Sequence, residues 1–70
     1  MNESISILLN GESREIPEGL TLLKLIEWLK LSADRLAIER NLNIVPRVQW
    51  EATHLEPGDR LEVVHLVGGG

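Results

Sequence analysis

The sequence predicts an α+β fold in which one main helix packs on one face of a mixed, four- to five-stranded sheet. Three observations favour it: an alternating strand that leads into Asn10-Gly11, a helical apolar stripe over residues 22–29, and a mostly apolar last strand. A chain of 70 residues forms at most one domain. Because it contains no cysteine, an aliphatic core has to hold this domain together.

The N-terminal stretch predicts a β-hairpin. Ile5, Ile7 and Leu9 recur at every second position, which is typical of a half-buried strand over residues 4–10. Asn10-Gly11 follows, and both residue types tolerate the positive φ angles of a tight hairpin turn. We therefore expect residues 12–16 to form the return strand.

The next stretch predicts the main helix, from Leu22 to about Leu29. Thr21 is a good N-cap residue and stands directly before the apolar run. Leu22, Leu25, Ile26 and Leu29 have the spacing of one helical face. That face needs an apolar sheet surface to pack against.

The C-terminal half predicts short extended segments separated by turns. Glu56-Pro57-Gly58-Asp59 is a strong turn signal before the last strand. The expected elements are a strand over residues 36–41, a turn over 41–43, a short extended piece at 44–45, one helical turn over 47–50, and a last strand over 60–67.

The last strand places two aliphatic residues beside the C-terminus. If Leu61 and Val63 face the core, the alternation turns Val64 and Leu66 outward. Exposed apolar residues on a small acidic protein are candidates for a partner-binding surface. Single exposed aliphatic residues are also ordinary, so both interpretations stay open.

The sequence ends in three glycines, which we separate as a tail (68–70) from the folded domain (1–67). Gly68, Gly69 and Gly70 have no Cβ atoms, so this strip fits a channel too narrow for other residues. We expect the carboxylate of Gly70 at its end to be accessible from every side. A frayed chain end is the competing interpretation.

Composition argues against several functional classes. No spacing of His54, His65 or the acidic residues resembles a catalytic or metal-binding set, so we predict no catalytic residue and no metal. The net charge is −4 and the basic residues are scattered, which argues against nucleic acid as a partner. We see no signal peptide and no run of membrane-spanning length. Absence of cysteine suits a cytoplasmic protein.

Five segments of the sequence form a recognisable set: Asn10-Gly11, AIERN at 37–41, IVPRVQW at 44–50, GDRLEVV at 58–64 and HLVGGG at 65–70. Together they resemble the ubiquitin-like β-grasp proteins, and within them the ThiS family of sulfur carriers most closely. The resemblance covers nearly the whole chain, although this tail has three glycines where the family pattern needs two.

The resemblance implies a carrier and not an enzyme. An E1-like, ThiF-type enzyme would use ATP to adenylate the Gly70 carboxylate, and the carrier would need no cofactor of its own. Sulfur from a cysteine desulfurase system would replace AMP, and the thiocarboxylate would reach a ThiG-type thiazole synthase of thiamin biosynthesis. Gly68 and Gly69 would thread the tail into these enzymes, and Val64 and Leu66 would contact them.

Three alternatives remain open at this level. A MoaD-type carrier would use the same chemistry in molybdopterin synthesis or tRNA thiolation. A ubiquitin-like modifier would form isopeptide bonds to lysines of target proteins. A plain interaction module would tolerate loss of the whole tail.

Overall fold

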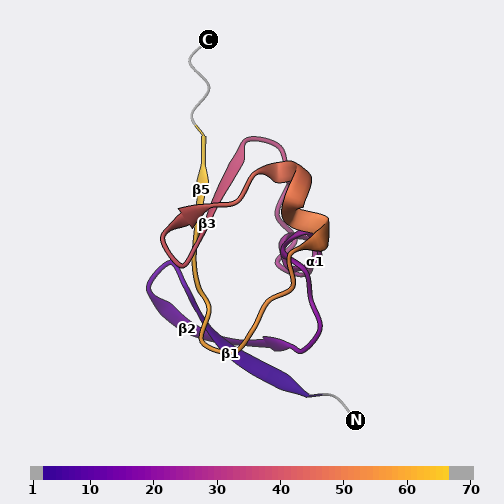
Figure 1. Ribbon diagram of the computed structural model, residues 1–70, viewed down its shortest axis with the longest axis vertical. Helices are drawn as coiled ribbons and strands as arrows, with labels where there is room; N and C mark the ends of the chain where they lie inside the picture. Colours follow the sequence, from indigo (N-terminus) through magenta and orange to yellow (C-terminus); the bar gives the residue numbers. More distant parts are fainter. Residues whose placement is uncertain (1–2, 67–70) are drawn as a thin grey trace.

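The structure is a computed structural model that describes residues 3–66 (Figure 1). Within this range one α-helix and one 3-10 helix accompany a five-stranded sheet. The elements are β1 (Ser4–Leu9), β2 (Glu12–Pro17), α1 (Leu22–Trp28), β3 (Leu36–Arg40), β4 (Asn43–Ile44), the 3-10 helix η1 (Arg47–Ala52) and β5 (Arg60–His65).

The sheet is mixed, and its strand order is β2-β1-β5-β3-β4. The last strand of the chain, β5, therefore lies in the centre. It runs parallel to β1 and antiparallel to β3, and Figure 1 shows it passing between the β1–β2 hairpin and β3. The predicted α+β architecture is confirmed.

The N-terminal hairpin forms at the predicted turn. Asn10 and Gly11 have φ angles of 51° and 83°, as a tight turn with two left-handed residues requires. The antiparallel register runs from Leu9 opposite Glu12 to Ser4 opposite Pro17. This register turns the alternating aliphatic residues of β1 toward α1.

Helix α1 begins and ends close to the predicted positions. The Thr21 side chain accepts a hydrogen bond of 3.2 Å from the Lys24 N–H, which satisfies a free donor of the first turn. The helix buries Leu22, Leu25 and Ile26 against the sheet. Leu29 forms the C-cap, one residue after the last helical residue.

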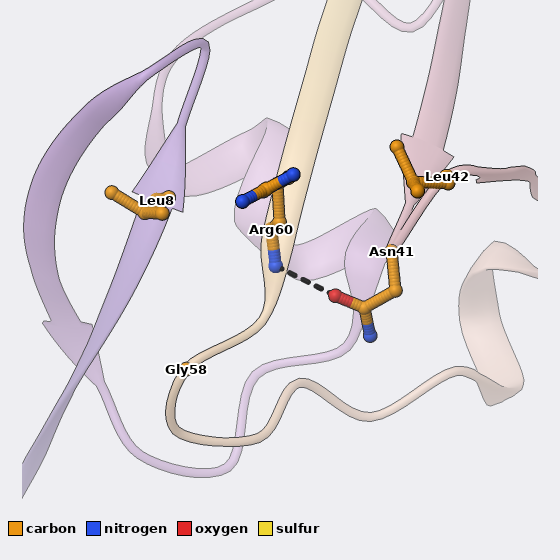
Figure 2. Close-up of a pocket in the computed structure, with 5 residues that line it drawn as sticks. All are labelled: Leu8, Asn41, Leu42, Gly58 and Arg60. Carbon is orange, nitrogen blue, oxygen red and sulfur yellow. Dashed lines mark hydrogen bonds between the residues drawn. The ribbon is translucent and has the colours of Figure 1, made fainter.

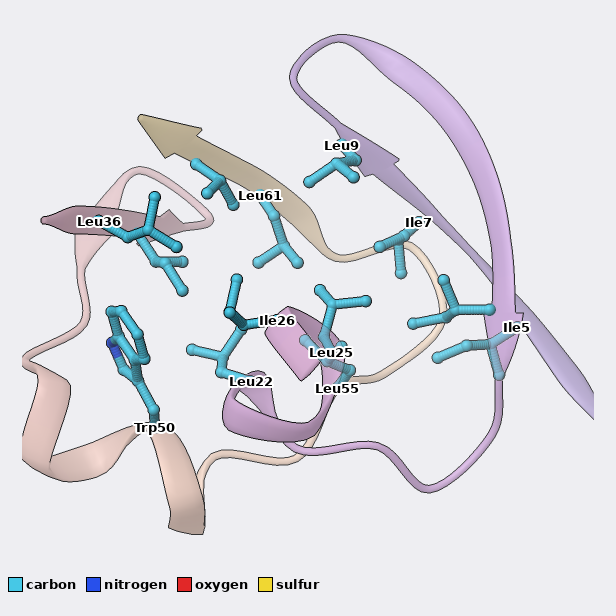
Figure 3. Packing of buried hydrophobic residues seen from close by; sticks show 13 residues of the cluster. Ile5, Ile7, Leu9, Leu22, Leu25, Ile26, Leu36, Trp50, Leu55 and Leu61 are labelled. Atoms are coloured by element: carbon cyan, nitrogen blue, oxygen red, sulfur yellow. The ribbon is translucent and has the colours of Figure 1, made fainter. Parts of the chain in front are cut away.

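The core lies between α1 and the inner face of the sheet, with η1 closing one side (Figure 3). Trp50 is its largest residue, and its Nε1–H donates a 2.9 Å hydrogen bond to the Val45 carbonyl. The bond gives the buried indole N–H a partner. The buried residues are Ile5, Ile7, Leu9, Ile16, Leu22, Leu25, Ile26, Leu36, Ile38, Trp50, Leu55, Leu61 and Val63.

Several predicted boundaries were wrong. Strands β1 and β3 end at Leu9 and Arg40, one residue earlier than expected, and β2 continues one residue further, to Pro17. Strand β5 ends at His65, before the expected end at Val67, because its partner β3 begins opposite, at Leu36. The short strand lies at residues 43–44, one residue earlier than expected, and the helical turn at Arg47 continues to Ala52 as a 3-10 helix. Val67 lies outside the described residues.

Candidate functional site

The end of β5 is the part of the structure nearest to the glycine tail in sequence. On one side Val64 pairs with Ala37 of β3, and the Leu66 N–H donates a 2.6 Å hydrogen bond to the Arg35 carbonyl. The side chain of Asn10 bonds to the backbone of Val63 on the other side. The chain is thus held on the β3 side as far as Leu66 and on the Asn10 side as far as Val63.

Alternation along β5 places its side chains on two different surfaces. Leu61 and Val63 are buried in the core. Val64 and Leu66 are exposed, with 49% and 54% of their surfaces accessible. The expected outward position of both residues is confirmed, and their role in binding stays a prediction. We call the helix-free side of the sheet, on which Val64 lies, the outer face.

A hollow of about 280 Å³ lies at the opposite end of β5. In Figure 2 the side chains of Leu8 and Leu42 stand on either side of Arg60, at the first residue of the strand. The Arg60 N–H donates a 2.9 Å hydrogen bond to the Asn41 side chain. At about 3.3 Å per residue, the six steps from Arg60 to Leu66 place this hollow about 20 Å from Leu66 along the strand direction.

Asp59 fixes the turn that leads into β5. Its carboxylate accepts hydrogen bonds from Arg40 Nε at 2.9 Å, from the Glu56 N–H at 2.9 Å and from Asn41 Nδ2 at 3.2 Å. Burial raises the pKa of Asp59, but these hydrogen bonds outweigh it and hold the pKa below its usual value. Asp59 is therefore an anionic anchor for the start of the central strand.

The remaining candidate groups are not gathered into a reactive site. His54 and His65 are both exposed; His65 lies on β5, and His54 lies in the segment between η1 and β5. Residues 3–66 contain no group of three side chains suited to holding a metal ion. No helix among these residues is long and apolar enough to cross a membrane. Gly68, Gly69 and Gly70 lie outside the described residues.

Comparison with known families shows which family this sequence belongs to. The family model described as "ThiS family" matches residues 7–70. This chain belongs to the ThiS family. The match covers all but the first six residues of the sequence and includes Gly68, Gly69 and Gly70.

Individual relatives support the ThiS family assignment. The sulfur carrier protein ThiS of Escherichia coli (strain K12) is 30% identical, over 94% of this chain and all of that protein. The crystal structure of the thiamine biosynthesis protein ThiS from Geobacter metallireducens has a TM-score of 0.82 at 27% identity, over 94% of this chain and 100% of that one. The ubiquitin-like β-grasp fold of this ThiS family member is therefore confirmed.

A second kind of relative is much longer. A thiazole synthase of Paramagnetospirillum magneticum (strain ATCC 700264 / AMB-1) is 35% identical over 94% of this chain. This ThiS family chain spans only 20% of the length of that protein.

Sequence reasoning missed two residues that position β5. Asn10 was interpreted only as a turn residue, and the long-range bonds of its side chain leave no local pattern. Asp59 was part of a turn signal and of a family-like segment, but nothing in the sequence pairs it with Arg40. Each residue acts on a partner far away in the chain.

Proposed function

We propose that this chain is a sulfur carrier of thiamine biosynthesis, with sulfur held as a thiocarboxylate on Gly70. The observation that carries the proposal is the ThiS family match, which extends through the glycines to residue 70. The likeness to ThiS of Escherichia coli over the whole of that carrier supports it. A carrier of this kind is a co-substrate of other enzymes and is not itself an enzyme.

The activation step makes the carboxylate of Gly70 reactive. A carboxylate oxygen attacks the α-phosphorus of ATP in a ThiF-like enzyme, and pyrophosphate leaves. The terminal sulfur of a persulfide, supplied by a cysteine desulfurase, then attacks the acyl carbon and AMP leaves. A thiol cleaves the remaining S–S bond, so that one carboxylate oxygen has been exchanged for sulfur.

The delivery step takes place on a thiazole synthase. Two relatives named thiazole synthase each contain a segment that is similar to 94% of this chain. That segment makes up 20% of the length of each relative. A direct transfer of sulfur from the carrier to the synthase would favour fusion of the two proteins into one polypeptide. We therefore propose a ThiG-like thiazole synthase as the acceptor of the sulfur.

The residues of this chain suit such a role. It has no cysteine, so no thiol side chain competes for transferable sulfur. Gly68, Gly69 and Gly70 present no side chain to a narrow active site, but ordering each costs about 1–2 kcal/mol. Contacts made by the folded body, with Val64 and Leu66 beside the tail, are available to offset that cost.

The test is an intact-mass measurement after incubation with ATP, a ThiF-like enzyme and a persulfide donor. We expect a mass shift equal to one oxygen replaced by sulfur, located in the C-terminal peptide. The matched control is the chain without Gly69 and Gly70, which should fold and acquire no sulfur. An unmodified mass with an active partner enzyme, or loading of the truncated chain, would refute the proposal.

A denaturing gel distinguishes a sulfur carrier from a protein modifier. Isopeptide-linked conjugates of this chain in its own cells would indicate a protein modifier. A carrier is expected to give free chain alone.

A further inference from the structure

Strand β3 has a residue with a left-handed backbone directly before it and another directly after it. Arg35 precedes the strand with a φ angle of 61°, and Asn41 follows it with a φ angle of 51°. In a regular antiparallel pair, two opposite residues exchange both of their N–H···O=C bonds. A left-handed φ angle turns the N–H of a residue away from the direction of its C=O. Each of these two residues therefore makes only one of the two backbone bonds to β5.

At the start of β5 a side chain replaces the second bond. The Asn41 N–H donates a 2.7 Å hydrogen bond to the Arg60 carbonyl. The Arg60 N–H in turn donates to Asn41 Oδ1 at 2.9 Å. Both backbone groups of Arg60 are thus satisfied by the same residue, and the start of the strand is closed.

At the other end of β5 only one bond is made. The Leu66 N–H donates a 2.6 Å hydrogen bond to the Arg35 carbonyl. Among the backbone hydrogen bonds of residues 3–66, none returns from the Arg35 N–H to the Leu66 carbonyl. Pairing with β3 therefore weakens at Leu66, four residues before Gly70.

An extended residue at position 35 would let this pairing continue. Its N–H would bond the Leu66 carbonyl, and the next hydrogen-bonded pair in the same register would join Ala33 to Gly68. Two residues would then extend beyond the sheet, which is at most about 7 Å of chain. The four residues after Leu66 can instead span up to about 13 Å.

We propose that Arg35 is a positioning residue for the glycine tail, because its left-handed backbone stops the β3–β5 pairing at Leu66. It thereby sets the length of chain that can enter the adenylating enzyme. The inference rests on the proposed function, in which Gly70 reacts inside another protein. A tail paired with Ala33 would have to leave the sheet before reacting, so only its unpaired fraction would be competent to bind.

The test is Arg35→Val, because a β-branched residue strongly disfavours the left-handed region. Hydrogen exchange followed by nuclear magnetic resonance should be slower at the amide of residue 35 than in the parent chain, since that amide gains the Leu66 carbonyl. The KM for this chain in pyrophosphate release by the purified adenylating enzyme should rise by about fivefold, with kcat unchanged. A KM equal to that of the parent chain, or a raised KM without slower exchange, would overturn the proposal.

Two control variants separate the backbone of Arg35 from its charge and from general strain. Arg35→Gly lacks the guanidinium but tolerates the left-handed backbone, so it should keep the KM of the parent chain. Lys30→Val also removes one positive charge at a φ angle of 61°, directly after the C-cap of α1. It should lower the urea midpoint of unfolding and leave the KM unchanged. An equal rise of KM in either control would overturn the proposal, because charge or strain would then explain the effect.

Failure of this inference and failure of the proposed function give different results. If the parent chain loads sulfur and Arg35→Val has the same KM, only the role of Arg35 is refuted. If the parent chain gives no pyrophosphate with an active adenylating enzyme, the proposed function fails and this inference fails with it.

Discussion

Asn10 and Val63 are joined by two hydrogen bonds although 53 positions separate them in the sequence. The Val63 N–H donates to Asn10 Oδ1 at 2.8 Å, and Asn10 Nδ2 donates to the Val63 carbonyl at 3.2 Å. Strand β1 has ended at Leu9, and the Asn10 N–H still donates a 2.9 Å hydrogen bond to the Leu61 carbonyl of β5, two residues before Val63. The side-chain amide takes the place of a strand residue there.

Asn10→Gly should destabilise the fold by about 1–2 kcal/mol, because two backbone groups of Val63 lose their partners. Glycine keeps the positive φ of the turn, so the loss reports the side chain and not turn strain. Urea unfolding followed by circular dichroism measures it. The control is Asn43→Ala, whose side-chain hydrogen bond to the Asn41 carbonyl is exposed and should be worth under about 0.5 kcal/mol. Equal losses in both variants would contradict this role for Asn10.

The Asp59 anchor should make stability depend on pH. The folded-state pKa of Asp59 lies below the ordinary value of 3.8, so its stabilisation is present in full above that value. It is lost as the pH falls from 3.8 through the lower folded-state pKa. Asp59→Asn should cost about 1.5–3 kcal/mol at neutral pH, with a smaller difference from the parent chain in acid. The free energy of unfolding of both chains is measured by urea titration. The titrations run from neutral pH to the lowest pH at which both chains fold.

Glu56→Gln is the control for Asp59. Its ion pair with Arg40 is 3.9 Å long and the Glu56 side chain is exposed, so about 0–1 kcal/mol is expected. A difference between the parent chain and Asp59→Asn that stays constant into acid would show that the Asp59 charge is not the source of the stability.

Leu42 lies in the left-handed region, with φ of 75°, although 75% of its surface is exposed. Bulky residues other than glycine adopt this conformation at a cost of about 1–2 kcal/mol. Leu42→Gly removes that cost and loses little burial, while the added freedom of the unfolded chain offsets part of the gain. We expect a net stabilisation of up to about 1 kcal/mol in urea unfolding. A destabilised variant would mean that Leu42 makes a contact worth more than its strain.

Val64→Asp should weaken binding to the adenylating enzyme much more than it weakens folding. Val64 is half exposed, so a β-propensity loss of under about 1 kcal/mol is expected in denaturation. Binding is measured by titration with the purified enzyme. Val48→Asp is the matched control, because Val48 is 90% exposed and lies on η1, outside the sheet. Equal affinities of the two variants would remove Val64 from the binding surface.

The elements that follow from local patterns were predictable from the sequence. The Asn10-Gly11 turn and the Thr21 cap are decided by neighbouring residues, and the structure has both where they were expected. The left-handed Leu42 was not predictable, because nothing near it in sequence is glycine. The end of β5 was also missed, because it depends on where β3 begins and not on the residues of β5 themselves.

Part of the candidate site was also predictable from the sequence, and part was not. The exposure of Val64 and Leu66 follows from period-two alternation, and the structure agrees. The contact of Arg35 with Leu66 was not predictable, because the register between β3 and β5 is set by core packing of residues far apart in sequence.

The central position of β5 also bears on how each copy of the protein is made. Residues 3–59 supply the β1–β2 hairpin and the β3–β4 pair, and β5 is the strand that joins them. During translation, this strand leaves the ribosome after every other element described here. A chain whose synthesis stops before Arg60 lacks the strand that joins the two strand pairs, and we expect its apolar residues to stay accessible to proteases. Folding thus selects copies whose synthesis has reached the strand that precedes the glycines.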